Sequence, residues 1–285
     1  MTPVEQAHGV SWLQRPEGRV AYEMTGTGPL VVCVPGMGDL RASYRFLRPA
    51  LVASGYRVVL MDLRGHGDSD TSFTRYGDEA TAEDITALLD HLGSPAVLVG
   101  NSMAAGAAVL VAAGRPDLVG GLALVGPFVR NAPVSALTRV LLRVALAAPW
   151  AAVSWNAYLP KLYAGRTPED FSSYRQSVAT ALRRPGYAKA FAQTTKTSHA
   201  AAEAALQQVQ TPVLIVMGAL DPDFTDPHKE AEWIGAQLQG EVVMVPDAGH
   251  YPQAQCPEVV SPAIVSFLDR VFRAERPLVR VVRGA

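Results

Sequence analysis

Three residues whose types could together do nucleophilic chemistry each follow an apolar, strand-like run: Ser102, Asp221 and His250. The runs that precede them are residues 95–99, 213–217 and 241–245. A serine hydroxyl becomes a useful nucleophile when a base takes its proton, and the base needs an acid to orient it. Open α/β sheets place their sites at the carboxyl ends of strands, so the three residues predict one site there.

The segment around Ser102 predicts a strand, a sharp turn with the serine at its apex, and a helix. The turn reads Gly100-Asn101-Ser102-Met103-Ala104, and a stretch of small residues from 104 to 113 follows it. This arrangement resembles the nucleophile elbow, G-x-S-x-G, of the α/β-hydrolase fold, with Ala104 in the place of the last glycine. Alanine adds only a methyl group, so we expect a slightly strained or shifted elbow that still forms.

The resemblance extends over residues 19–273 and implies the triad order Ser102, Asp221, His250, because the family follows serine with an acid and then histidine. It also implies an oxyanion hole made by the backbone N–H groups of Met37 and Met103. The loop of Met37 reads Pro35-Gly36-Met37-Gly38, with Pro35 where the family often has histidine. A serine at the elbow argues against the dehalogenase and epoxide-hydrolase branches, in which a carboxylate attacks.

Two choices within the site rest on neighbouring residues. Asp223 and Asp226 lie close to Asp221, but Asp221 matches the family's acid position, so we favour it. His66 stands in a polar, glycine-rich loop, residues 62–69, that occurs in the family as a structural turn. Asp39 is expected to cap a helix over residues 40–54, in the way that a short acidic side chain caps a first turn.

Apolar strands alternate with helical patterns along most of the chain, which indicates a mostly parallel sheet covered on both faces. The expected fold is therefore α/β, a doubly wound α/β-hydrolase sheet. Between residues 127 and 208 only helix-like segments occur, and we interpret this stretch as a helical cap inserted after the sixth strand. The core then comprises residues 1–126 and 209–285. A helix over 81–92 is expected to have Thr81 as its N-cap.

The predicted cap carries ten Lys and Arg residues against three acidic ones, so it is about +7 and the remainder about −8. This balance permits an anionic substrate, although solvated arginines explain it more simply. The cap's aromatic residues favour an apolar pocket of modest size. We expect substrate contacts from Gly36, Phe128, Trp155 and His199.

The composition bounds the class of protein. With 285 residues, 49% of them hydrophobic, and a net charge of −1, the chain can bury a large core and has no charge that favours nucleic acid. Its two cysteines, Cys33 and Cys256, suggest neither a disulfide framework nor a zinc site. No signal peptide or membrane span is evident, which favours a cytoplasmic protein. We expect a small-molecule substrate and no metal or cofactor, and the oligomeric state is not indicated.

The leading hypothesis is a serine hydrolase that cleaves a small, apolar ester or related carbonyl compound through an acyl-enzyme on Ser102. A second is a carbon–carbon hydrolase, a cofactor-free haloperoxidase or perhydrolase, or a lyase that uses the same three residues. A third, from another class, is a non-catalytic ligand-binding protein that keeps them.

Overall fold

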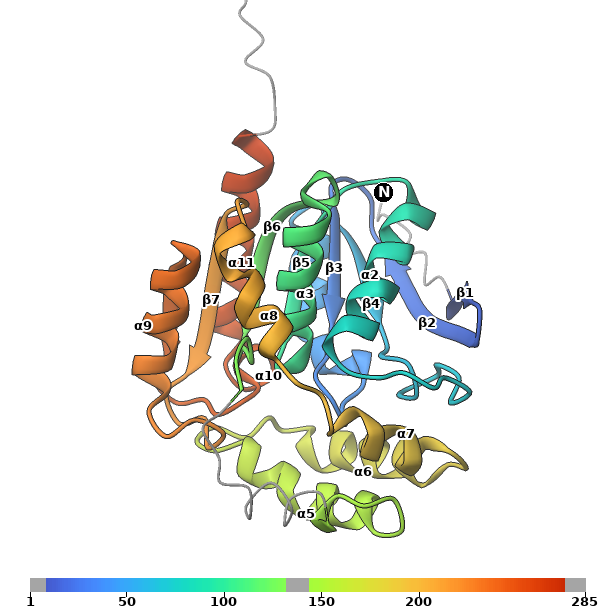
Figure 1. The fold of residues 1–285 in the computed structure, drawn as a ribbon. Coiled ribbons are helices and arrows are strands. Elements are labelled where there is room, and N and C mark those ends of the chain that lie inside the picture. The colour runs from blue at the N-terminus through green and yellow to red at the C-terminus, as the bar shows by residue number, and fades with distance from the viewer. Residues whose placement is uncertain (1–8, 132–143, 275–285) are drawn as a thin grey trace, which may run out of the picture.

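A twisted sheet of eight strands runs through the molecule in the order β1-β2-β4-β3-β5-β6-β7-β8 (Figure 1). The computed structural model describes residues 9–131 and 144–274. β1 and β2 pair antiparallel, as do β2 and β4, and every other pair is parallel. The strands are β1 (Ser11–Arg15), β2 (Gly18–Thr25), β3 (Leu30–Val34), β4 (Arg57–Met61), β5 (Ala96–Asn101), β6 (Val119–Val125), β7 (Val213–Gly218) and β8 (Glu241–Val245).

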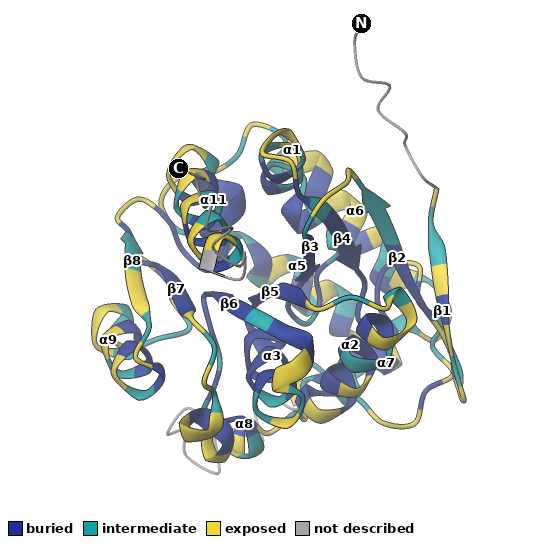
Figure 2. Ribbon diagram, turned by 90° about the horizontal axis from the view of Figure 1, so that it is seen from above, coloured by how far each residue is buried: buried dark blue, intermediate teal, exposed yellow. Residues whose placement is uncertain are grey.

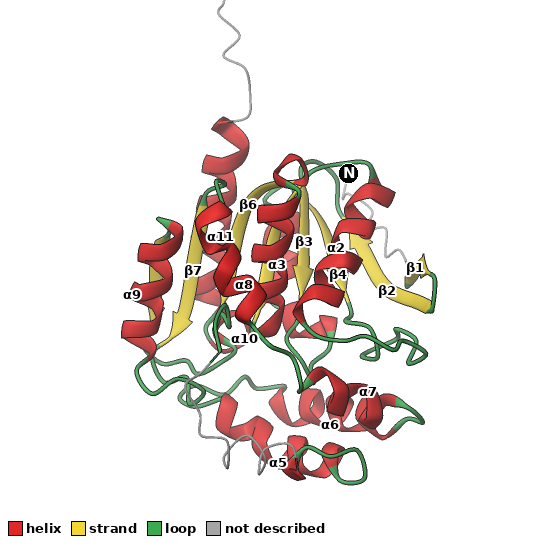
Figure 3. Cartoon of the chain, viewed as in Figure 1, coloured by secondary structure: helices red, strands yellow, loops and turns green. Residues whose placement is uncertain are grey.

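Helices cover both faces of the sheet, which confirms the doubly wound α/β fold (Figures 1 and 3). One face is covered by α2 (Asp78–Leu92), α3 (Met103–Gly114), α8 (Ala200–Ala205) and α9 (Pro227–Leu238). The other is covered by α1 (Leu47–Ala53) and α11 (Pro257–Ala274). Because side chains alternate along a strand, β3 sends Val32 to the first face and Val31 and Cys33 to the second. The central strands are buried along their length, whereas β8 is largely exposed at the edge (Figure 2).

The predicted cap is a layer of helices inserted after β6, the sixth strand. It contains α5 (Ala151–Leu162), α6 (Phe171–Arg183) and α7 (Tyr187–Thr194), which lie beyond the carboxyl ends of the parallel strands (Figure 3). The next helix, α8, packs against α3 instead, and its residues Ala202 and Ala205 belong to the core cluster on the face of the sheet that α3 covers. The helices over the sheet's edge therefore end at α7, and the outer boundary of residue 208 stays a prediction.

Three local predictions differ from the structure. Residues 40–54 are not one helix but a 3₁₀ turn, η1 (Arg41–Tyr44), followed by α1, and Asp39 does not cap either. Thr81 is not the N-cap of α2, which begins at Asp78. Asp78 N–H instead donates to the hydroxyl of Thr197, 3.1 Å away, so a residue remote in the sequence satisfies the first turn. The sequence pattern does not predict β1, because only Leu13 of its five residues is buried.

Some expectations concern segments whose structure is not described. Residues 132–143 of the predicted cap and residues 275–285 of the predicted core lie outside the described residues. Within the described ranges, no helix is both long and apolar enough to cross a membrane. Cys33 and Cys256 are buried free thiols. Three further short elements complete the description of the fold: η2 (Pro116–Leu118), η3 (Leu206–Gln208) and α10 (Pro252–Gln255).

A buried ion pair joins the first strand, the loop after β4 and helix α2. The fully buried Asp84 accepts hydrogen bonds from Arg64, at 2.7 and 2.6 Å, and from Arg15 at 2.9 Å. Arg64 is itself only 5% exposed, so its charge depends on Asp84 for compensation.

Replacing Asp84 by alanine should therefore destabilise the protein strongly, by about 3–5 kcal/mol, because it leaves a buried guanidinium unpaired. The matched control is Asp117→Ala, which removes an exposed carboxylate partner of Arg115 and should leave the urea unfolding midpoint almost unchanged. Urea unfolding followed by circular dichroism measures both, and equal midpoints for the two variants would contradict this role of Asp84.

Candidate active site

Ser102 stands at a sharp turn between β5, which ends at Asn101, and α3, which begins at Met103. Its backbone has φ 57° and ψ −126°, a conformation that a non-glycine residue rarely adopts and that costs energy. The turn is tight, since a Cβ added to Gly100 would lie 2.6 Å from the carbonyl oxygen of Ala104. The elbow forms with alanine at its fifth position, and Ala104 is fully buried there.

Backbone hydrogen bonds join the elbow to two neighbouring segments. Ser102 N–H donates to the carbonyl of Val125 at 2.9 Å, and Phe128 N–H donates to the carbonyl of Ser102 at 3.2 Å. The side-chain amide of Asn101 donates to Val125, at 2.9 Å, and to the carbonyl of His250 at 3.3 Å. The end of β5, the connection leaving β6 and the histidine loop are therefore held together beside Ser102.

His250 is oriented by a carboxylate from the neighbouring loop. Its Nδ1 lies 2.6 Å from Oδ2 of Asp221, and both residues are 2% exposed. Asp223 is 3.9 Å from the same nitrogen and accepts instead a hydrogen bond from the hydroxyl of Tyr158, at 2.6 Å. An Nδ1–H that donates to Asp221 leaves Nε2 of the ring as an acceptor, which is the tautomer that a general base needs.

The charges around His250 favour its protonated form. Burial lowers the pKa of His250, but the charge and hydrogen bond of Asp221, with the charges of Asp223 and Asp39, outweigh it and raise the pKa above the ordinary histidine value. An imidazolium formed during a reaction would therefore be stabilised where it stands. Potential ligand atoms of Asp221, Asp223 and His250 lie within 4.8 Å of one another, but Asp221 and His250 already pair, and Tyr158 engages Asp223. That the site needs no metal stays a prediction.

The loop after β3 approaches the serine closely. A Cβ added to Gly36 would lie 2.7 Å from Cβ of Ser102, so only glycine fits there without a shift. The loop is a turn closed by Asp39 N–H, which donates to the carbonyl of Gly36 at 3.4 Å. Gly38 holds the third position of this turn with φ +72°, as type II turns require. Met37, whose N–H is one of the two predicted oxyanion donors, is the second residue of this turn. The other predicted donor, Met103 N–H, lies at the start of α3, where the helix dipole is positive.

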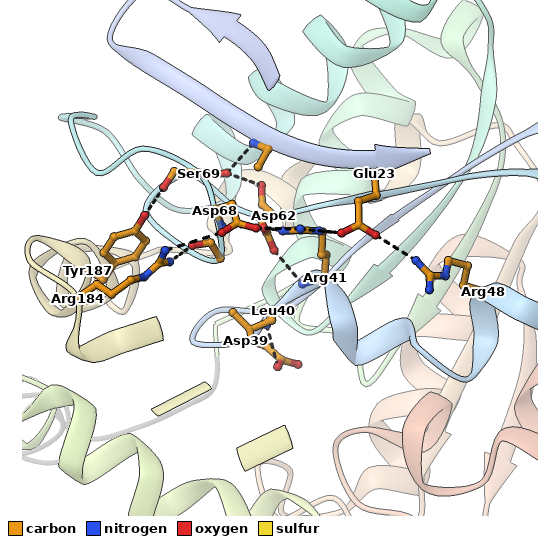
Figure 4. A network of polar contacts seen from close by, with 12 residues as sticks. Glu23, Asp39, Leu40, Arg41, Arg48, Asp62, Asp68, Ser69, Arg184 and Tyr187 are labelled. Carbon is orange, nitrogen blue, oxygen red and sulfur yellow. Dashed lines mark hydrogen bonds and ion pairs between the residues drawn. The ribbon is translucent and has the colours of Figure 1, made fainter. Parts of the chain in front are cut away.

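A network of ion pairs holds the residues that leave this turn (Figure 4). Arg41 N–H donates to Oδ1 of the buried Asp62 at 2.9 Å, and the Arg41 guanidinium contacts Glu23, Asp62 and Asp68. The hydroxyl of the fully buried Tyr44, at the end of η1, donates to the carbonyl of Val34 at 2.8 Å. The turn is thereby tied to the ends of β2, β3 and β4.

Three of the four predicted substrate contacts lie around the elbow or the turn over residues 36–39. Gly36 approaches Ser102 as described, and the indole N–H of Trp155, from α5, donates to the carbonyl of Gly38 at 2.8 Å. The Phe128 ring lies 5.8 Å from the His250 ring, centroid to centroid. His199 is one step further out, because it stacks on Phe128 and its Nδ1 pairs with Asp78 at 2.8 Å. That these residues touch a substrate stays a prediction.

Residues that the sequence did not single out also line the site. Phe224 stacks on Phe128 with ring centroids 4.8 Å apart, and Tyr158 bonds Asp223. Tyr251 follows His250 and packs its ring edge against the imidazole at 5.2 Å. All three lie in segments that the sequence pattern highlights, but only the fold shows that Tyr251 contacts the histidine and that Phe224 and Tyr158 contact its neighbours Phe128 and Asp223.

His66 lies in a buried turn, as the sequence suggested. Its Nδ1 is 3.1 Å from the carbonyl of Arg64, and burial lowers the pKa of His66 to about 4. The ring is therefore neutral at physiological pH and packs edge-on against Phe191 of the cap, at 6.3 Å. These contacts favour the structural role.

The charge asymmetry between cap and core is expressed as ion pairs between them. Arg130 pairs with Glu230 of α9, with Nε 2.9 Å from a carboxylate oxygen, and Arg166 pairs with Glu258 of α11. A cavity of about 620 Å³ opens between α6 and the residues that follow the turn over residues 36–39. Its arginines, among them Arg41 and Arg45, are paired with carboxylates and are not free to hold an anion. At least three of the ten basic cap residues, Arg130, Arg166 and Arg184, thus pair with acidic residues of the core.

The fold and the elbow define the class of protein: a capped α/β hydrolase with serine at the elbow. The family model described as "Alpha/beta hydrolase family" matches residues 31–263, and the chain belongs to this family. The chain is 32% identical to 2-(acetamidomethylene)succinate hydrolase of Mesorhizobium japonicum, over 88% of this chain and 93% of that protein.

Two further proteins resemble the chain over almost its whole length. A probable esterase of Oryza sativa subsp. japonica is 28% identical over 93% of this chain and 97% of its own. The solved structure of a thermophilic esterase from Thermogutta terrifontis has a TM-score of 0.77 and 28% identity, covering 93% of this chain and 99% of that one. Relatives with hydrolase and esterase names show that the protein is an α/β-fold hydrolase.

Because Gly36 lies so close to Ser102, we expect Gly36→Ala to displace the turn or the serine. The rate of Ser102 labelling by a fluorophosphonate probe should fall at least about tenfold, with a lower melting temperature. The matched control is Gly114→Ala in α3, where an added Cβ meets nothing within 4 Å and alanine is the better helix former. Wild-type labelling by Gly36→Ala would show that the close approach does not matter.

Proposed function

We propose that the protein is a serine hydrolase that cleaves a small, apolar ester or related carbonyl compound through an acyl-enzyme on Ser102. The observation that carries the proposal is the 2.6 Å contact between His250 and Asp221, in a histidine loop that Asn101 joins to the serine elbow. A buried, carboxylate-oriented imidazole beside a serine on a sharp turn supplies the parts that acyl transfer requires.

In the proposed mechanism, Nε2 of His250 takes the Ser102 proton as Oγ attacks the substrate carbonyl. The negative charge on the resulting tetrahedral oxygen is stabilised by the N–H groups of Met37 and Met103. Asp221 stabilises the imidazolium, which then gives its proton to the leaving group. Water attacks the acyl-enzyme in the second half, with His250 again acting as base.

The surroundings of the site favour an apolar substrate. Aromatic rings of Phe128, Phe224 and Tyr251 lie next to one another or to His250. Two of the described cap arginines, Arg130 and Arg166, are engaged with core carboxylates, so neither is a free cation for an anionic substrate. The names of the two esterase relatives agree with an ester, and the succinate hydrolase name extends the proposal to related carbonyl compounds.

The alternatives predicted from the sequence remain hypotheses. Carbon–carbon hydrolysis, haloperoxidase or perhydrolase chemistry and lyase chemistry would use the same three residues on other bonds. A panel of p-nitrophenyl esters of rising acyl length measures the size of the acyl pocket and separates all of these enzymes from a protein without activity. A ligand-binding protein without activity would hydrolyse none of these esters.

Ser102→Ala should abolish fluorophosphonate labelling and reduce ester hydrolysis by at least about 10³-fold, because the nucleophile is gone. Ser54→Ala is the matched control, since Ser54 is an exposed serine after α1 whose hydroxyl contacts only its own helix. In-gel fluorescence and p-nitrophenyl acetate hydrolysis measure the two effects. Equal rates for wild type and Ser102→Ala would rule out Ser102 as the nucleophile.

The two aspartates near His250 should differ sharply in their effects. Asp221→Asn should lower kcat by about 10³- to 10⁴-fold, since the amide no longer holds the catalytic tautomer or the imidazolium. Asp223→Asn should lower it less than about tenfold, because Asp223 lies 3.9 Å from Nδ1 and is bonded to Tyr158. Steady-state kinetics on one ester gives both values, and the reverse order would assign the acid role to Asp223.

A further inference from the structure

A buried carboxylate outside the proposed triad, Asp39, joins the oxyanion turn to the cap. It is 1% exposed, and its Oδ1 accepts hydrogen bonds from Leu40 N–H, at 2.9 Å, and from the hydroxyl of Tyr174 in α6. Its other oxygen, Oδ2, is buried without a hydrogen-bond partner among the described residues. Such an unsatisfied buried oxygen is costly and calls for a reason.

The backbone of Asp39 closes the turn that is proposed to hold the oxyanion. Its N–H donates to the carbonyl of Gly36, and Met37 and Gly38 are the two residues between them. A side chain fixed at both Leu40 and Tyr174 therefore restrains the fourth residue of this turn. Trp155 holds the third residue, Gly38, from the same cap.

The charge of Asp39 also acts on the proposed base. The groups whose charges interact with Asp39 are Tyr44 of η1, Arg45 after η1, Tyr163 after α5, Tyr174 of α6, and His250 and Tyr251 of the histidine loop. Tyr251 stacks on Tyr163 at 4.8 Å and touches the His250 ring, so these aromatic rings connect the histidine loop to the surroundings of Asp39. Arg45 is committed to Asp170, at 2.6 Å, and leaves the Asp39 charge only partly compensated.

We propose that Asp39 is a positioning residue for the hydrolase reaction: through Tyr174 it holds the oxyanion turn against the cap, and its charge favours the imidazolium of His250. This rests on the proposed function of Ser102 and His250. The lack of a hydrogen-bond partner at Oδ2 agrees with this role, because a carboxylate that accepts fewer hydrogen bonds stabilises the positive charge of the histidine more strongly.

Asp39→Asn keeps the shape of the side chain and removes its charge. Because Asp39 raises the pKa of His250, and the base must be unprotonated to act, the acid limb of kcat/KM should move to lower pH. We expect a shift of at least about 0.3 pH units. The same shift should appear in an NMR titration of the His250 ring protons, a measurement that needs no substrate.

Tyr174→Phe tests the hydrogen bond while it keeps the charge. It should lower kcat about 5- to 30-fold with little change in KM, and it should not move the acid limb downward. Glu169→Gln is the matched control, since it removes an exposed carboxylate just before α6 that is not among the charges acting on His250. Its His250 titration should coincide with that of the wild type.

Stability separates this role from a purely structural one. Burial raises the pKa of Asp39 to about 6. A folded-state pKa above the unfolded value means that ionised Asp39 opposes folding at neutral pH, and that this cost fades as pH falls through about 6 toward 4. Asp39→Asn should therefore melt at the same temperature as the wild type, or higher, at pH 7.5.

An unchanged His250 titration in Asp39→Asn, or wild-type kcat in Tyr174→Phe, would overturn the proposal. A large loss of melting temperature in Asp39→Asn with the titration unmoved would show a structural role only, which also overturns it. Failure of the proposed function appears differently, as wild-type protein that hydrolyses no ester and is not labelled at Ser102. In that case the NMR titration still decides whether the Asp39 charge acts on His250.

Discussion

The site depends on one constraint, the unusual backbone conformation of Ser102. A residue held at φ 57° persists only where its neighbours determine it, and here hydrogen bonds with Val125 and Phe128 do so on both sides. The same constraint explains the two glycines that have no room for a side chain, Gly100 beneath the turn and Gly36 against the serine. The carboxyl ends of β3, β5 and β6 lie next to one another in the sheet, and the segments that leave these three strands all contact Ser102 or adjoin it.

Those features that depend on short stretches of sequence could be predicted. Buried strands appear as continuous apolar runs, and each loop that follows a run carries its polar residue at the same edge of the sheet. The elbow and the loops of Asp221 and His250 are located in this way, and the choice of Asp221 over Asp223 agrees with their distances from Nδ1. Their roles in catalysis stay a proposal.

Features that depend on contacts between distant segments could not be predicted. The first turn of α2 is capped by Thr197, 119 residues away, so the local sequence favours Thr81 wrongly. β1 lies at the edge of the sheet and buries one side chain, which leaves no alternation strong enough to recognise. Part of the positive charge of the cap pairs with the acidic core, as in Arg130 with Glu230, and neither segment alone indicates this pairing.

The cap contacts the backbone on which catalysis is proposed to depend. Trp155 of α5 bonds the carbonyl of Gly38, and Tyr174 of α6 bonds the side chain of Asp39. These are the third and fourth residues of the turn that contains Met37. A substitution that displaces α5 or α6 should therefore also move the turn. If the turn holds the oxyanion as proposed, substrate range and transition-state stabilisation are coupled, and a change of cap sequence should alter kcat together with the substrates that fit.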